Sequence, residues 1–71
     1  MTDPIIEAKK VIMVGVKFRY DNYLYHVLGI FDEENVAVKY YGKHKQYWNY
    51  EFMDMYFIGL GLIDKRIVIT A

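Results

Sequence analysis

Apolar residues alternate with other residues near the start of the chain. From Val11 to Tyr20, every second position falls on one face of an extended segment, and that face is apolar throughout (Ile12, Val14, Val16, Phe18 and Tyr20). Lys17 and Arg19 fall on the opposite face, as in a half-exposed strand. Asp21 and Asn22 follow, and both tolerate a positive φ. A two-residue hairpin turn is therefore predicted between this strand and the next.

The alternation continues in three further segments. Residues 23–31 predict a second strand with apolar side chains on both faces, in which Gly29 marks a bulge. Residues 36–41 predict a third strand that points Val36, Val38 and Tyr40 inward. Residues 46–51 predict a fourth. Its two faces carry different pairs (Trp48 with Tyr50, and Tyr47 with Asn49). Turns rich in charged residues separate these segments.

The spacing changes after Glu51. Two sets of apolar residues recur at helical intervals (Phe52, Met55, Tyr56 and Gly59; Met53, Phe57 and Leu60), and Gly59 and Gly61 are suited to ending such a segment. A short helical or 3₁₀ turn is predicted here. Residues 62–63 and 67–69 then form a final strand or a short closing hairpin.

The first ten residues allow two interpretations. Thr2 or Asp3 is suited to capping a helical turn, Pro4 to its first position, and Glu7 to its first turn. The equal alternative is an extended arm that packs on the domain or on a neighbouring subunit. Residues 1–10 are therefore predicted to be an arm or a short helical turn, and residues 11–71 a single small β-barrel domain.

This order of elements resembles a known superfold. An apolar strand with a glycine (Tyr23 to Gly29), an alternating strand ending in Tyr40-Tyr41-Gly42, and a tight turn before the last strand are similar to the SH3-like small barrels, with Tudor-like barrels the closest subgroup. The likeness covers about residues 12–63. It implies an all-β fold, a small five-stranded SH3-like barrel with a short helical turn before the last strand.

Composition excludes several classes of protein. The 71 residues include no cysteine and no serine, so disulfides and the usual acyl-transfer nucleophiles are absent, and we expect no enzyme activity. Nine basic and nine acidic residues cancel, which argues against a simple polyanion binder. The chain has no apolar run near the length of a membrane span and no readable secretory signal. A cytoplasmic protein without cofactor or metal is predicted.

The densest chemical feature is the segment 39–48. It interleaves three lysines with four aromatic residues and contains no acid (Lys39, Tyr40, Tyr41, Lys43, Lys45, Tyr47 and Trp48). Aromatic rings stack on bases while lysines contact phosphates, so this hairpin is a candidate surface for single-stranded nucleic acid. The simpler interpretation is a hairpin whose Tyr40 and Trp48 fill the core while its lysines are solvated.

Aromatic residues are in excess, with eight tyrosines, four phenylalanines and one tryptophan in a domain whose core is small. Outward-pointing tyrosines are typical anchors of protein interfaces. The predicted binding residues are Tyr23, Lys39, Tyr41, Lys43, Lys45 and Tyr47. The predicted function is a non-catalytic protein-interaction module that self-associates, since apolar residues at both ends (Ile5, Ile6 and Ile67 to Ile69) also favour burial between subunits. The alternatives are single-stranded nucleic-acid binding and a small viral or mobile-element inhibitor of a host enzyme.

The two histidines are weak signals. His26 is expected to be a strand residue with a satisfied hydrogen bond, and His44 to be solvated between lysines. Metal sites usually need three or four ligands, which the scattered carboxylates and two histidines do not suggest.

Overall fold

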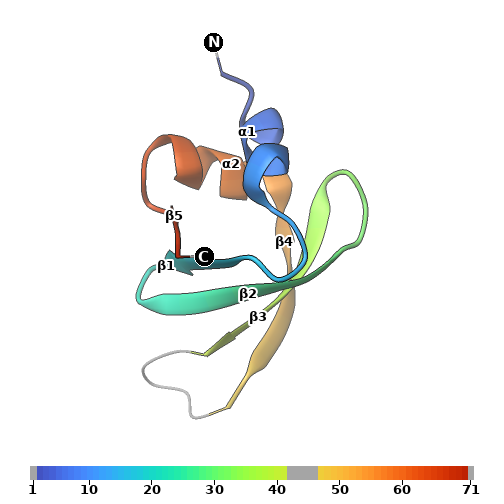
Figure 1. Cartoon of the computed structure of the whole chain (residues 1–71), viewed down its shortest axis with the longest axis vertical. Helices are drawn as coiled ribbons and strands as arrows, with labels where there is room; N and C mark the ends of the chain where they lie inside the picture. Colours follow the sequence, from blue (N-terminus) through green and yellow to red (C-terminus); the bar gives the residue numbers. More distant parts are fainter. Residues whose placement is uncertain (1, 42–46, 71) are drawn as a thin grey trace.

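The protein is described by a computed structural model covering residues 2–41 and 47–70. It is mostly β, with two helices at one end of a five-stranded antiparallel sheet (Figure 1). Along the chain the elements are α1 (Pro4–Val11), β1 (Lys17–Tyr20), β2 (Tyr23–Ile30), β3 (Asn35–Tyr41), β4 (Asn49–Asp54), α2 (Met55–Ile63) and β5 (Val68–Ile69).

The sheet has the order β4-β3-β2-β1-β5 and is open. β1 to β4 form a meander of hairpins, and the two-residue β5 returns beside β1 through pairs of Phe18 with Ile69 and Arg19 with Val68. Within the described residues β4 and β5 do not pair, so the prediction of a closed barrel is not met. The physical reason lies in β5, because two residues are too few to bridge from β1 to the far edge of the sheet.

The first strand is shorter than predicted. The alternating segment 11–20 becomes the end of α1, an irregular loop and a four-residue strand. Gly15 has a φ of 93°, which a glycine adopts readily and which breaks the extended run. Met13 and Val14 are exposed as a result. The hairpin turn is confirmed, since Asp21 and Asn22 have φ angles of 50° and 67°.

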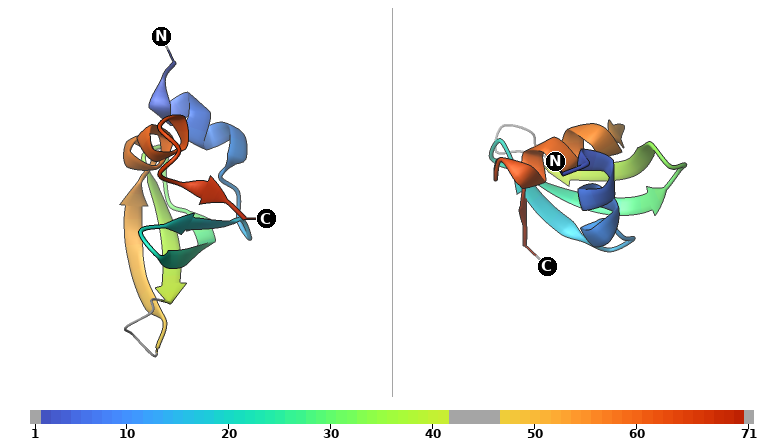
Figure 2. Two further views of the ribbon diagram at one scale, coloured as in Figure 1. Left: turned by 90° about the vertical axis from the view of Figure 1, so that its left-hand side faces the viewer. Right: turned by 90° about the horizontal axis from the view of Figure 1, so that it is seen from above.

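The second strand contains the predicted bulge. Val27 pairs with Val38 and Gly29 with Ala37, so Leu28 is the extra residue on β2. The sheet is bent and twisted, so that β1 runs across the direction of β4 in Figure 2. The bulge thus contributes to a sheet whose one face can wrap around a small core.

The fourth strand lies three residues later than predicted. It spans Asn49–Asp54 rather than 46–51, and it continues directly into α2. Met53 is the residue of β4 that enters the core, opposite Val36. Trp48 precedes the strand and is 39% exposed, so it does not fill the core as the simpler interpretation expected.

The N-terminal segment is helical, which decides between the two interpretations. The Asp3 side chain accepts a hydrogen bond from the backbone amide of Ile5 at 2.9 Å, and Pro4 occupies the first turn. α2 is capped in the same way, since the Asp54 carboxylate accepts from the Tyr56 amide at 2.7 Å. This helix confirms the predicted helical segment, although at nine residues it is more than a single turn. It continues through Gly59 and Gly61, which were expected to end it, and includes residues 62–63, which were expected to belong to the last strand or hairpin.

The core lies between one face of the sheet and the two helices. Its buried residues are Ala8, Ile12, Phe18, Tyr25, Val27, Val36, Val38, Met53, Met55, Ile58 and Ile67. The helices touch closely where Gly59 of α2 faces the backbone of Pro4 in α1. α1 therefore covers the core through its contact with α2 and through the buried Ala8. Figure 2 shows both helices together at the same end of the sheet.

Candidate functional site

The other face of the sheet has no covering element among the described residues. We call it the outer face, and it is defined by the residues that alternate with the buried core positions: Lys17, Arg19, Leu24, His26, Leu28, Ala37, Lys39, Tyr41, Tyr50 and Phe52. Leu28, Tyr41, Tyr50 and Phe52 are all exposed. A sheet face this rich in large apolar side chains is typical of a contact surface.

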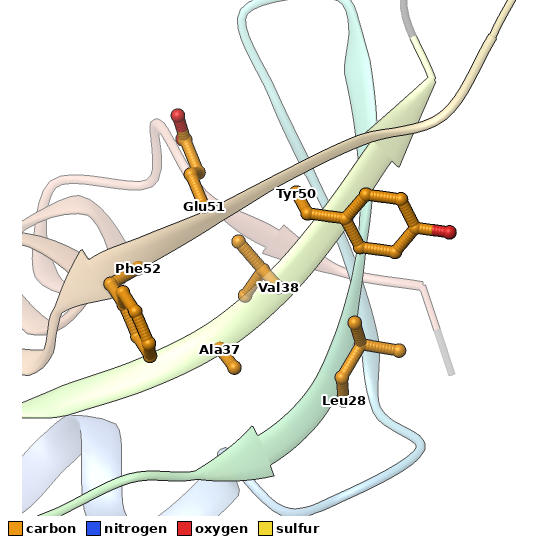
Figure 3. A pocket seen from close by; sticks show the side chains of 6 residues that line it. All are labelled: Leu28, Ala37, Val38, Tyr50, Glu51 and Phe52. Atoms are coloured by element: carbon orange, nitrogen blue, oxygen red, sulfur yellow. The ribbon is translucent and has the colours of Figure 1, made fainter.

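A groove runs across the middle of the outer face. It has a volume of about 270 Å³ and is lined by Leu28, Ala37, Val38, Tyr50, Glu51 and Phe52 (Figure 3). Figure 3 shows Ala37 and Val38 in the middle, with the ring of Phe52 on one side and Tyr50 and Leu28 on the other. Phe31 extends this apolar surface, since its ring centroid lies 5.3 Å from that of Phe52. The small side chain of Ala37 therefore creates the hollow between larger neighbours.

Strand pairing arranges the outer-face residues in rows across the strands. Beyond a row of Arg19, Leu24 and Tyr41, three rows follow one another along β3. The first row runs Lys17, His26, Lys39 and Tyr50 across β1 to β4. The second contains Gly29, Ala37 and Phe52, and the third pairs Asn35 with Asp54 beside the turn at residues 32–34. The rows are thus cationic, apolar and acidic in turn. With a rise of about 3.3 Å per residue, successive rows lie roughly 7 Å apart along β3.

Trp48 lies at the cationic end of the outer face. Its ring centroid is 4.9 Å from that of His26 and 5.6 Å from that of Tyr41. The Lys39 Nζ atom lies 4.7 Å from the Trp48 centroid, a cation–π contact. Lysine and aromatic side chains of two strands and a loop are thereby gathered into one cluster.

His26 occupies the centre of the cationic row. Its Nε2 atom is buried and has no hydrogen-bond partner within the described part of the chain, which corrects the expectation of a satisfied histidine. Its pKa is lowered from 6.5, first because burial disfavours the charged ring and then because Lys17 and Lys39 repel a further positive charge. The row therefore holds a neutral imidazole between two cations.

Replacing Lys17 by glutamine is expected to raise the pKa of His26 while leaving it below 6.5, because burial remains the largest cause of the shift. The folded state resists protonation here, so the unfolded chain takes up the proton first as pH falls. Folding stability should accordingly decrease as pH falls from 6.5 toward the pKa of the folded state. NMR titration of the ring measures the pKa directly. Lys9→Gln on α1 is the matched control, and an equal rise in that variant would contradict the assignment.

The predicted binding residues are divided between different places. Lys39 and Tyr41 lie together on the outer face, and Tyr47 is 65% exposed just before Trp48. Tyr23 lies on the covered face, where it is half-buried against Tyr25 and Tyr40. Lys43 and Lys45 lie outside the described residues. Sequence reasoning missed Tyr50, Phe52 and Leu28, and the alternation of β4 in the correct register is the signal that identifies the first two.

The inward tyrosines form a separate cluster. The ring of Tyr25 is stacked on that of Phe18 with centroids 5.1 Å apart, and it also contacts Tyr20, Tyr23 and Tyr40. Burial, with a contribution from the Glu51 carboxylate, raises the pKa of Tyr25 to about 12. Tyr25 is buried and belongs to the core, so its ring contacts with these neighbours stabilise the covered face.

Three further findings concern function. The described residues contain no group of three or more His, Cys, Asp or Glu side chains placed to hold a metal ion. In the same part of the chain, neither helix has the length and apolar character needed to cross a membrane. Comparison of the chain with protein-family models, with curated proteins and with solved structures finds no match.

Proposed function

We propose that this protein is a non-catalytic protein-interaction module and that the outer face is its contact surface. One observation carries the proposal, namely the exposure of large apolar side chains around the groove over Ala37. Phe31 is 70% exposed, Tyr50 69% and Phe52 63%, and all three adjoin or extend the groove. Burial of these side chains against a partner would remove their apolar surface from water, which stabilises protein contacts.

The composition of this surface supports a protein partner. Aromatic residues in a groove, with charged residues at its ends, match the general anatomy of an interface with an apolar centre and a polar rim. Tyrosine and tryptophan dominate binding energy in such interfaces because they bury a large area with few rotatable bonds. Among the described residues, Lys39 of the predicted lysine rim lies at one end of this surface, and Lys17 and Arg19 lie on the same face.

The proposal predicts that substitutions in the groove abolish partner binding without unfolding the protein. The test is a pull-down from the source cell with quantitative mass spectrometry, comparing the wild type with Tyr50→Thr/Phe52→Thr. Threonine keeps the preference for strand structure while removing the rings. We expect specifically captured proteins to fall at least about tenfold, as truncating hot-spot aromatics does.

The matched control changes the exposed face of α2. Tyr56→Gln/Ile63→Gln removes two apolar side chains that are 49% and 44% exposed, on the far side of the molecule's core from the groove. This variant should capture the same proteins as the wild type. Equal loss in both variants, or loss in neither, would contradict the outer face as the contact surface.

A second candidate function rests on the cationic cluster. Lys39 lies over Trp48 beside Tyr41, and Lys17 and Arg19 are on the same face. The cations could therefore contact the phosphates of a single-stranded nucleic acid while the aromatic rings stack on its bases. Titrating a labelled oligonucleotide at low salt tests it, with Lys39→Ala/Tyr41→Ala as the variant. Binding that is absent, or that does not weaken with salt, would remove this candidate.

We also propose that the fold is an open relative of the SH3-like barrels, as the resemblance of residues 12–63 suggests. The support is the meander of β1 to β4, followed by a short helix and a last strand that returns beside the first. A shared fold of this kind carries no function with it.

A further inference from the structure

The charges of the outer face are separated by the apolar groove. Lys17 and Lys39 lie in the first row, with Arg19 two residues further along β1. None of these three cations forms an ion pair with a described carboxylate. The groove row between the two ends (Gly29, Ala37 and Phe52) contains no charged residue, and the side chain of Glu51, which also lines the groove, points away from it in Figure 3. One end of the surface therefore offers cations that have no acidic partner.

The opposite end of the outer face carries carboxylates that also lack an ion-pair partner among the described residues. Glu33 and Glu34 are exposed and form no ion pair with the described residues. Their turn directly follows Phe31, whose ring lies on the groove side against Phe52. The turn is held in place by the Asp32 carboxylate, which accepts from the backbone amides of Glu34 and Asn35 at 2.8 Å each. This end is thus a fixed acidic tip beside an aromatic ring.

The two ends lie at similar distances from Ala37. Lys39 is two residues from Ala37 along β3 in one direction, and Asn35, where the acidic tip joins the strand, is two residues away in the other. Each step is roughly 7 Å at the strand rise of about 3.3 Å per residue. When the outer faces of two copies lie against each other, a two-fold axis can run between them, perpendicular to the strands and close to Ala37. This axis places the cationic end of each copy opposite the acidic end of the other. Such an interface is self-complementary, as two-fold contacts must be.

We propose that the occupant of the outer face is a second copy of this chain. The acidic tip of each copy, with Glu33 and Glu34, lies over Lys17 and Lys39 of the other, and the apolar row around Phe52 packs against its symmetry mate. This inference rests on the proposed function, because it names the partner of the same surface.

Charge reversal tests this arrangement in solution. Analytical ultracentrifugation of the wild type at neutral pH should show a dimer that weakens as salt is raised. Lys17→Glu/Lys39→Glu makes both ends acidic, and Glu33→Lys/Glu34→Lys makes both basic. Each variant alone should dimerise about 100-fold more weakly, because like charges then face one another.

Mixing the two variants is the decisive step. An equimolar mixture should recover a dimer containing one copy of each, since every reversed charge again meets its opposite. Recovery also shows that both variants are folded. Lys9→Glu/Lys65→Glu, which makes the same change in net charge on α1 and on the turn after α2, should leave the dimer unchanged.

A wild type that stays monomeric at its highest soluble concentration would overturn the inference, as would a dimer insensitive to the reversals or a mixture that fails to recover. A monomer that still loses its captured proteins through Tyr50→Thr/Phe52→Thr would leave the proposed function standing and exclude only the second copy. Salt-dependent binding of an oligonucleotide by a monomeric wild type, lost in Lys17→Glu/Lys39→Glu, would also overturn it in favour of nucleic acid.

Discussion

Replacing Phe18 by alanine is expected to remove about 3–5 kcal/mol of folding stability. Phe18 is fully buried, and its ring is stacked on that of Tyr25 at the centre of the covered face. The substitution loses the transfer free energy of the ring and leaves a cavity that a short strand paired on both sides cannot close. A domain of this length has a total stability of about 4–11 kcal/mol, so much of the population should be unfolded.

Denaturant unfolding followed by circular dichroism measures this loss. The control is Phe31→Ala, which removes the same side chain from a position that is 70% exposed and contacts only the ring of Phe52 among described aromatics. We expect it to cost no more than about 1 kcal/mol, the scale of one aromatic pair. Similar losses at both positions would contradict the assignment of the two faces of the sheet.

Gly59→Ala is expected to destabilise the protein by about 1–3 kcal/mol, although alanine is the better helix former. A Cβ atom at this position would collide with the backbone carbonyl of Pro4, so α1 must shift away from α2. The gain in helix propensity is only about 1 kcal/mol. Hydrogen exchange should show the amides of α1 losing protection before those of β2 and β3, because α1 is the element displaced.

Gly61→Ala is the matched comparison within the same helix. Its Cβ would meet the Ile67 side chain, with the nearest atom, Cδ1, at 2.5 Å, and a side-chain end can rotate where a backbone cannot. We therefore expect a smaller loss at Gly61 than at Gly59, with α1 still protected. A Gly59→Ala variant that is more stable than the wild type would show that the helices do not approach as described.

Local signals predicted several elements correctly. The pair Asp21-Asn22 is suited to the positive φ angles of a tight hairpin, and Gly29 marks the bulge in β2. Asp3 and Pro4 have the properties of a helix start, and the change of spacing after Glu51 indicated α2. In each case the deciding interaction lies within a few residues of sequence, which is why the sequence alone reveals it.

The register predicted for β4 was wrong, and this is why Tyr50 and Phe52 were not predicted as residues of the site. A strand over 46–51 places Trp48 and Tyr50 together and directs one face inward, but pairing with β3 begins at Asn49 and brings Met53 into the core. Tyr23 illustrates the same limit, because β2 is apolar on both faces and alternation alone cannot tell which face is covered. Lys39 and Tyr41 were placed correctly, since their neighbours Val38 and Tyr40 indicate the inward direction.

By itself, the sequence determined a small, mostly β domain without cysteine or serine, with its turns, its bulge and its helix starts. Tertiary structure decided which face of the sheet α1 and α2 cover and that the sheet stays open. It also decided that His26, Lys39 and Trp48 meet and that charged rows lie on either side of Ala37. The physical reason is that turn and cap preferences are local, whereas strand register and helix packing depend on contacts between residues far apart in the chain.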